Sequence, residues 1–200
     1  MSQSDVNPSA ITEATTADER RQVQRLFEEI IGDIDAGAVP AITNAYFPAV
    51  VAQYHDPDTG VLVGAALATR SQLAGRAAEF AALGIPLVPE MRRAMAPGVL
   101  DRHRELDLLA VRAEFRGRGI GSQLLAHIEG RLRADGVRVL FGNVVHGLDA
   151  EALRRFYRRH GYRVLDDGRD LPPLLGVAWM PPTSEWPEAP RFYFYKMLAG

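Results

Sequence analysis

A glycine-rich segment between two regular elements constrains this chain more than any other feature of its sequence. Residues 114–125 read EFRGRGIGSQLL, in which glycines and arginines alternate before an apolar helical pattern begins. The preceding HRELDLLAV (103–111) alternates as a strand does, and Ser122–Ala134 carries leucine and isoleucine at helical spacing. Glycine costs backbone entropy unless the chain must turn sharply or approach a ligand closely. A strand, a glycine loop and a helix N-terminus in this order predict an anion site.

The residues of this loop narrow the kind of anion that it would bind. Free N–H groups and the helix dipole favour a phosphate, and Arg116 and Arg118 add charged donors, so we expect a diphosphate. The spacing of Gly117, Gly119 and Gly121 fits neither a Walker loop nor GxGxxG. No acidic residue follows where a ribose-binding strand would end. The sequence therefore disfavours a nucleotide-dependent dehydrogenase.

The rest of the chain predicts an α/β protein with no linker between domains. Periodicity and turn residues predict a helix over 18–31, strands over 50–55 and 61–70, one or two helices within 72–99, a strand over 137–145, a helix from Asp149 to about His160, and strands over 162–165 and 191–198. Residues 1–17 lack periodicity, which predicts a flexible N-terminal tail followed by a single domain over 18–200.

Composition and charge limit the classes of partner. The chain is 47% hydrophobic and 24% charged, as soluble globular proteins are, and its net charge of −2 gives no reason to expect nucleic acid. It has no cysteine, which excludes disulfides and thiol nucleophiles, and its histidines lack zinc-binding spacing, so we expect no metal. No signal peptide or membrane-length apolar run is visible. We therefore expect a cytoplasmic protein.

The loop and its flanking elements resemble the GNAT family of N-acetyltransferases. That family's acetyl-CoA signature is Arg/Gln-x-x-Gly-x-Gly/Ala after a strand and at the start of a helix, and residues 116–121 (RGRGIG) satisfy it. The segment FYRRHGY (156–162) is similar to the end of the family's fourth helix. The family often has an asparagine seven positions before the tyrosine of this segment, where this chain has Ala150. The resemblance implies a GNAT fold: a mixed, mostly antiparallel sheet that splays between its fourth and fifth strands, with helices on both faces.

The resemblance also implies how the cofactor is held. Acetyl-CoA would be the co-substrate, with its pantetheine arm beside the fourth strand and its pyrophosphate in the glycine loop. The cofactor-binding residues implied in this way are Leu109, Ala110, Val111, Arg116, Gly117, Arg118, Gly119, Ile120, Gly121 and Ser122. The backbone N–H of Leu109 would polarise the thioester carbonyl.

Two side chains are implied as the acid and the base of acetyl transfer. Tyr157 matches the family's tyrosine acid, and a phenol with a pKa of about 10 can protonate a thiolate at neutral pH. The alternative is that Tyr157 is only a core aromatic residue. Glu105 matches a glutamate base of some members and shares a strand face with Asp107, which would raise one pKa. A water chain in place of Glu105 is the alternative base.

The function that follows is direct transfer of an acetyl group from acetyl-CoA to an amine of a small molecule or a peptide. Two alternatives stay open at this point: a non-catalytic GNAT-fold protein that binds acyl-CoA, and another nucleotide-binding α/β protein. The acidic residues near 101–107 suggest a cationic amine as acceptor. We expect no nucleic-acid or membrane partner, and a homodimer is left open because the final strand is an edge candidate.

Overall fold

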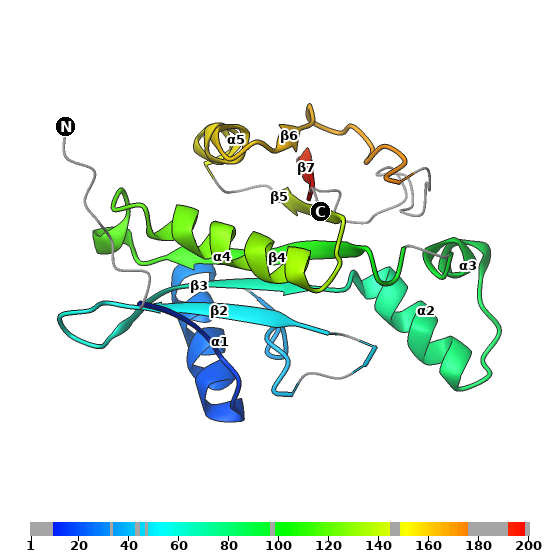
Figure 1. Cartoon of the computed structure of the whole chain (residues 1–200), viewed down its shortest axis with the longest axis horizontal. Coiled ribbons are helices and arrows are strands. Elements are labelled where there is room, and N and C mark those ends of the chain that lie inside the picture. The colour runs from blue at the N-terminus through cyan, green and yellow to red at the C-terminus, as the bar shows by residue number, and fades with distance from the viewer. Residues whose placement is uncertain are drawn as a thin grey trace. The chain divides into compact units, whose positions relative to one another are not determined.

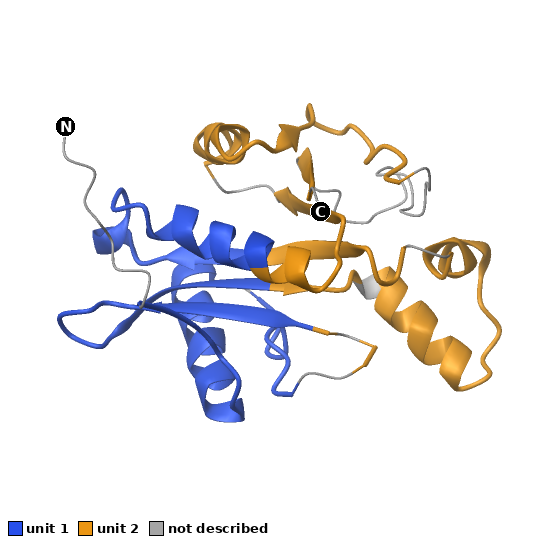
Figure 2. Cartoon of the chain, viewed as in Figure 1, with its two compact units in different colours: residues 1–43, 49–67, 108–130 blue, residues 44–48, 68–107, 131–200 orange. Residues whose placement is uncertain are grey.

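The chain folds into helices and strands that form two compact units (Figure 2). The computed structural model describes residues 10–32, 34–42, 45–46, 48–96, 99–144, 149–175 and 192–198. Unit 1 comprises residues 1–43, 49–67 and 108–130, and unit 2 comprises residues 44–48, 68–107 and 131–200. In chain order the elements are β1 (Ile11–Glu13), α1 (Ala17–Ile31), β2 (Val50–His55), β3 (Leu62–Thr69), α2 (Gln72–Ala82), α3 (Pro89–Ala94), β4 (His103–Val111), the 3₁₀ turn η2 (Ala113–Phe115), α4 (Ile120–Ala134), β5 (Val139–Val144), α5 (Ala150–Arg159), β6 (Arg163–Val164) and β7 (Phe192–Met197) (Figure 1).

The strands form a mixed sheet in the hydrogen-bonded order β1-β2-β3-β4-β5-β7-β6. β4 and β5 run parallel, whereas β1 with β2, β5 with β7 and β6 with β7 are antiparallel. β3 and β4 each run from one unit into the other. This sheet confirms the α/β class predicted from the sequence. The single domain expected over residues 18–200 stays a prediction.

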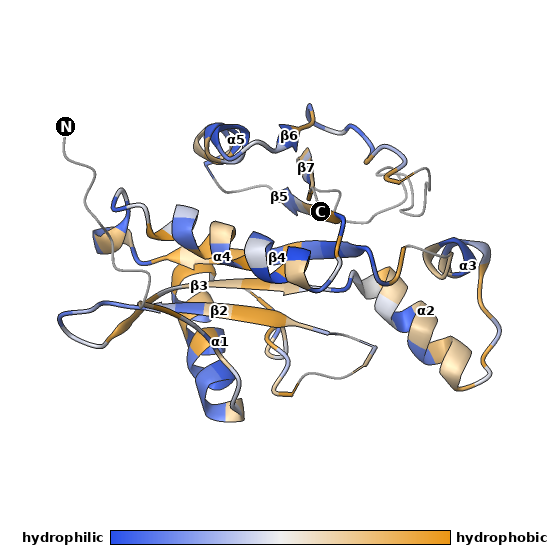
Figure 3. Ribbon diagram, viewed as in Figure 1, coloured by the Kyte–Doolittle hydropathy of each residue, from blue (hydrophilic) through white to orange (hydrophobic). Residues whose placement is uncertain are grey.

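In unit 1 the helices α1 and α4 cover opposite faces of the sheet. The buried residues Leu26 and Phe27 of α1 share one core cluster with Ala65 of β3. On the other face of β3, a Cβ placed on Gly64 would lie 3.1 Å from the Ile120 side chain and 3.2 Å from that of Leu124, both in α4. Adjacent residues of a strand point to opposite faces, so the two helices sandwich β3. In keeping with this packing, α1 carries both hydrophilic and hydrophobic residues (Figure 3).

The N-terminal segment differs from the expected loose tail. Ile11–Glu13 pair antiparallel with β2, and Ala14 is buried against α1. Thr16 then caps α1: its hydroxyl accepts from the N–H of Glu19 at 3.2 Å, and the Glu19 carboxylate accepts from the N–H of Thr16 at 2.8 Å. The tail prediction is therefore wrong for residues 11–16, because a three-residue strand leaves too short a pattern to detect. Residues 1–9 lie outside the described part of the chain.

In unit 2, β5 lies between β4 and β7. Its parallel ladder with β4 comprises only three pairs, which end at Glu105–Phe141, whereas its ladder with β7 comprises six. β4 continues for six residues past Glu105, as a sheet that splays between these strands requires. The helices predicted within residues 72–99 are α2 and α3. Their residues Ala77 and Ala94 pack with Val139 and Phe141 of β5.

The helix α5 begins and ends at the residues that the sequence indicates. Asp149 caps its N-terminus by accepting from the N–H of Ala152 at 3.0 Å, and Gly161 follows its C-terminus with φ +79°. The arginines of α5 do not all face solvent, because Arg154 is buried. That side chain is 6% exposed, donates to the Leu165 carbonyl at 2.6 Å, pairs with Asp167 and lies over the Phe192 ring. Arginine can be buried in this way because its donors are satisfied there.

Candidate active site

The glycine loop joins β4 to α4 within unit 1, as the sequence predicts. Gly117 and Gly119 have φ of +76° and +80°, a conformation that costs a residue with a Cβ about 1–2 kcal/mol. Gly121 lies inside the first turn of α4 instead. A Cβ on Gly117 would meet nothing within 4 Å, and one on Gly119 only the Gln123 amide at 3.9 Å. The loop surface is therefore open, and the glycines serve the backbone conformation.

The first turn of α4 offers hydrogen-bond donors to an anion. Its first α-helical bond runs from the Gln123 N–H to the Gly119 carbonyl at 3.1 Å. By helix geometry the N–H groups of Ile120, Gly121 and Ser122 come before this bond and have no acceptor inside the helix. They point outward at the positive end of the helix dipole. This arrangement suits a phosphate group.

The two loop arginines brace the loop as well as charging it. Arg116 donates from Nε to the Val111 carbonyl at 3.0 Å, which ties the loop to the end of β4. Arg118 donates to the Glu114 carbonyl at 3.2 Å and stacks on the Phe115 ring at 4.8 Å. Each side chain is exposed and has further N–H groups that can reach an anion.

The end of β4 is fixed within unit 1, next to the predicted cofactor strand of Leu109, Ala110 and Val111. The Arg112 N–H donates to the Val63 carbonyl at 2.9 Å, and the Arg112 side chain forms a bidentate pair with Glu29 of α1. Ala110 is buried in the core, whereas Leu109 is half-buried. The strand that the sequence assigns to the pantetheine arm is thus anchored at its C-terminal end.

In unit 2, the carboxylates of Glu105 and Asp107 lie two residues apart on one face of β4, each with its own partner. The Asn143 amide of β5 donates to Glu105 at 3.2 Å, and the Thr69 hydroxyl of β3 donates to Asp107. Tyr193 of β7 pairs with Asn143 in the β5–β7 ladder, and burial, followed by the charges of Glu105 and Asp170, raises the pKa of the Tyr193 phenol.

The surroundings of this pair raise the pKa of both carboxyls. For Glu105 the cause is first the loss of water around the carboxyl and second repulsion by Asp107, opposed by the Asn143 hydrogen bond. For Asp107 it is again the loss of water, opposed by the Thr69 hydrogen bond. Solvent still reaches Asp107, so we assign the larger rise in pKa to Glu105, which is only half-exposed. Once it is ionised, a carboxyl with a raised pKa is a stronger proton acceptor than an ordinary carboxylate.

The phenol of Tyr157 lies on the other face of the β5–β7 ladder. Its ring stacks on that of Phe194 with centroids 3.6 Å apart and meets Tyr162 edge-on. Phe194 pairs with Gly142, and Glu105 with Phe141, so the Phe194 ring and the Glu105 carboxylate belong to opposite faces of the sheet. Burial raises the pKa of Tyr157, which keeps the phenol protonated throughout the neutral range. The structure therefore does not bring Tyr157 and Glu105 into one cluster. It places them on opposite faces of the sheet.

Sequence reasoning missed Thr69 and Asn143. Both lie on strands neighbouring β4, and their contacts depend on the alignment of residues between strands. Had the register Glu105–Phe141 been known, strand alternation would have placed Asn143 on the face of Glu105.

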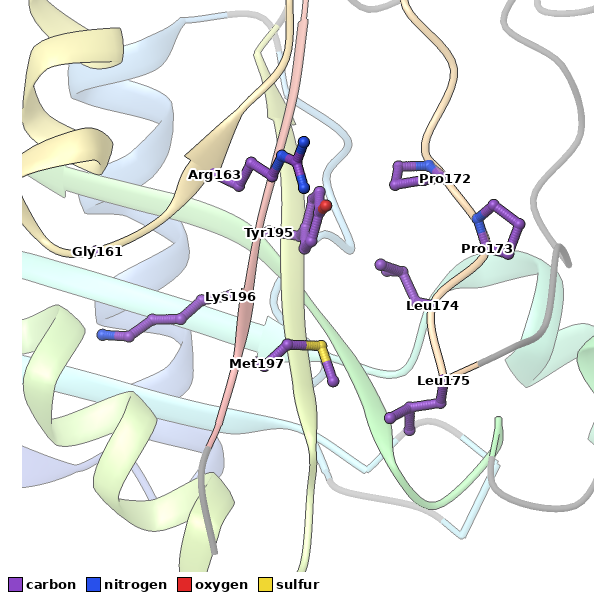
Figure 4. A pocket seen from close by; sticks show the side chains of 9 residues that line it. All are labelled: Gly161, Arg163, Pro172, Pro173, Leu174, Leu175, Tyr195, Lys196 and Met197. Carbon is purple, nitrogen blue, oxygen red and sulfur yellow. The ribbon is translucent and has the colours of Figure 1, made fainter.

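The described part of unit 2 also has a hollow of about 570 Å³ beside β7, bordered by residues 172–175 and 195–197 (Figure 4). None of the site residues predicted from the sequence lines it.

A comparison with protein families decides the identity of the fold. Residues 61–164 match the acetyltransferase (GNAT) domain. The chain belongs to the GNAT family. The match includes β3, β4, the glycine loop, α4, β5 and α5, and so all of the site residues predicted from the sequence.

Solved structures share the fold of this GNAT chain at low sequence identity. Ard1 from Thermoplasma volcanium is 12% identical, with a TM-score of 0.57 over 96% of this chain and 99% of that one. Aminoglycoside 6'-acetyltransferase type Ii is 20% identical, with a TM-score of 0.55 over 95% and 97%. An aminoglycoside 6'-N-acetyltransferase complexed with coenzyme A is 18% identical, with a TM-score of 0.55 over 95% and 97%. Among curated proteins, none matches the sequence significantly.

Two further features of the described residues concern metal binding and the crossing of a membrane. In the described residues, no three His, Asp or Glu side chains gather where they would hold a metal ion. Within the same residues, none of the helices combines the length and the apolar character that crossing a membrane requires.

Proposed function

We propose that this GNAT protein is an N-acetyltransferase that moves an acetyl group from acetyl-CoA directly to an amine. The observation that carries the proposal is the division of proton chemistry between the two faces of the sheet in unit 2. A raised carboxyl pKa at Glu105 suits a base on one face, and the phenol of Tyr157, which stays protonated at neutral pH, can supply a proton on the other. Acetyl transfer requires both, because the amine loses a proton and the thiolate gains one.

Each group has one role in the proposed step. The amine nitrogen attacks the thioester carbon, and the N–H of Leu109 stabilises the negative charge that develops on the carbonyl oxygen. The C–S bond then breaks, and the departing thiolate takes the proton of Tyr157. The proton lost by the amine goes to Glu105, directly or through a water chain. The glycine loop and the first turn of α4 hold the pyrophosphate, so the donor reacts from a fixed position.

We propose a cationic amine of a small molecule or a peptide as the acceptor. Glu105 and Asp107 place two carboxyls with raised pKa on one face of β4; an ammonium group bound there would favour their ionised forms, which can then remove its proton. The absence of cysteine in the sequence supports direct transfer, because the chain offers no thiol to carry the acetyl group between two half-reactions.

Thermal melting with four ligands tests the proposal. A ligand that binds only the folded state raises the melting temperature, so acetyl-CoA and CoA should raise it while ATP and NAD should not. Gly119→Glu places a carboxylate in the loop and should abolish the shift. Gly119→Ala is the matched control: it has the same backbone cost at φ +80° but adds no charge, and should retain most of the shift.

The outcomes separate the proposal from its two rivals. A shift with ATP or NAD alone would indicate another nucleotide-binding protein. A shift with acetyl-CoA, combined with no turnover of any of a panel of diamines, amino sugars and peptides, would indicate a non-catalytic acyl-CoA-binding protein. A Tyr157→Phe variant that behaves as the wild type does would point the same way. No shift with either coenzyme in a folded protein would refute the proposal.

A further inference from the structure

Lys196 of β7 is the one lysine in a chain whose other long basic side chains are all arginine. Its side chain leaves β7 on the side opposite to Tyr195 and Met197, away from the segment 172–175 (Figure 4). Lys196 Nζ donates to the carbonyl of His160 at 2.8 Å and lies 5.3 Å from the centre of the Tyr162 ring. These two contacts hold the Lys196 side chain against the turn that follows α5.

His160 is the residue at which α5 ends, and its turn is fastened to Tyr157. The N–H groups of His160 and Tyr162 both donate to the Tyr157 carbonyl, at 3.1 and 3.0 Å. A carbonyl at a helix C-terminus lacks a partner inside the helix and lies at the negative end of the helix dipole, so an ammonium group is favoured there. Lys196 therefore stabilises the turn that follows Tyr157.

β7 holds the Tyr157 segment at two points on one face. Phe194 stacks on the Tyr157 ring, and Lys196, two residues later on the same strand, bonds the turn after it. The ring stack fixes the distance of the phenol from the sheet. A stacked ring can still slide in its own plane, and the Lys196 contact opposes that movement along the helix axis.

The space around Lys196 favours lysine over arginine. A Cβ on Gly161 would come within 3.7 Å of Lys196 Cε and 3.9 Å of Nζ, so the stem passes close to the backbone of this turn. The ammonium is a compact point charge that fits between a carbonyl and a ring, whereas a guanidinium is a wide planar fork. A substitution by arginine would keep the charge but displace the turn.

We infer that Lys196 is a positioning residue for Tyr157: it holds the C-terminal turn of α5 so that the phenol points correctly at the departing thiolate. This inference rests on the proposed function, because it requires Tyr157 to be the acid. It predicts that the loss of Lys196 lowers kcat through Tyr157 alone and leaves the binding of acetyl-CoA in place.

Steady-state kinetics of Lys196→Met and Lys196→Arg, each with and without Tyr157→Phe, test the inference. Lys196→Met should lower kcat about ten- to a hundredfold, as a small misplacement of a catalytic group does, with the KM for acetyl-CoA changed less than twofold. In the Tyr157→Phe background it should cause no further loss. Arg159→Met is the matched control: it removes a positive charge from the same helix end, is exposed, and should leave kcat unchanged.

A second measurement does not depend on activity. Hydrogen exchange of the Tyr162 amide, which donates to Tyr157, should accelerate in Lys196→Met and not in Arg159→Met. Equal kcat losses with and without Tyr157→Phe, or unchanged exchange, would overturn the inference while the transferase proposal stands. A wild type without turnover would refute the proposed function, and amide exchange alone would then decide whether Lys196 holds the turn.

Discussion

Gly142 of β5 admits the aromatic ring on which Tyr157 rests, so Gly142→Ala is a demanding test of the packing. A Cβ at this position would lie 2.5 Å from Cζ of Phe194 and 2.9 Å from the backbone oxygen of Leu106. Carbon atoms prefer separations of about 3.5–4 Å, so the Phe194 ring would have to retreat by roughly 1 Å. It has no free direction, because the Tyr157 ring stacks on it, and the Leu106 backbone belongs to the neighbouring strand β4.

Overpacking of this kind costs about 1–3 kcal/mol, and a backbone atom that cannot swing away favours the upper half of that range. We therefore expect Gly142→Ala to lower the free energy of unfolding by about 2–3 kcal/mol. In a chain of this length that corresponds to a fall in melting temperature of about 4–12 °C.

Urea denaturation of Gly142→Ala and Gly130→Ala measures the effect against a matched control. Gly130 lies inside α4, where a Cβ would meet nothing within 4 Å, so the same substitution should stabilise that helix by about 0.5–1 kcal/mol. The two variants should thus differ in sign. A Gly142→Ala variant as stable as wild type would refute the packing argument and with it the close contact between Gly142 and the Tyr157–Phe194 stack.

Two further predictions concern Glu105, the proposed base, and α5, the helix that carries the proposed acid Tyr157. The folded state raises the pKa of Glu105, so from about pH 4 upward the carboxyl ionises in the unfolded state but not in the folded state. The free energy of unfolding of the wild type should therefore fall relative to that of Glu105→Gln as the pH rises, until the carboxyl of the folded protein has ionised too. Urea midpoints of both proteins at several pH values check this, and a constant difference would contradict the raised pKa. Asp149→Ala removes the N-cap of α5 and should cost about 1 kcal/mol, whereas Asp149→Asn should cost far less, and equal losses would argue against the cap.

Elements with a long apolar pattern could be predicted from the sequence, and those that depend on distant pairing could not. The strand over 103–111 and the strand over 50–55 have the predicted bounds, because the first has apolar residues at alternate positions and the second is an apolar run followed by turn residues. β1 has three residues and exists through its pairs with β2. The burial of Arg154 was missed for a similar reason: its partners Leu165 and Asp167 lie beyond the end of α5.

The candidate site divides in the same way between local and cross-strand features. The glycine loop is a local motif, so its position between β4 and α4 could be predicted from the sequence. Two of its three glycines adopt the positive φ that glycine accommodates best. Glu105 and Asp107 were readable as a pair by strand alternation. Their partners Asn143 and Thr69 were not, because nothing within one strand reports which residue stands opposite on the next.

The register of β5 and β7 places the proposed acid, Tyr157, and the proposed base, Glu105, on different faces of the sheet. Six consecutive pairs fix it, with Phe194 opposite Gly142 and Tyr193 opposite Asn143. A slip by one residue would exchange the faces of the whole strand: Phe194 would leave the Tyr157 ring, and Lys196 would leave the end of α5. The glycine at position 142 opposes that slip, because it alone in β5 makes room for the Phe194 ring. In the proposed reaction the amine and the thiolate are both bonded to one carbonyl carbon, and proton transfer to and from opposite sides of the sheet serves them without competition between Glu105 and Tyr157.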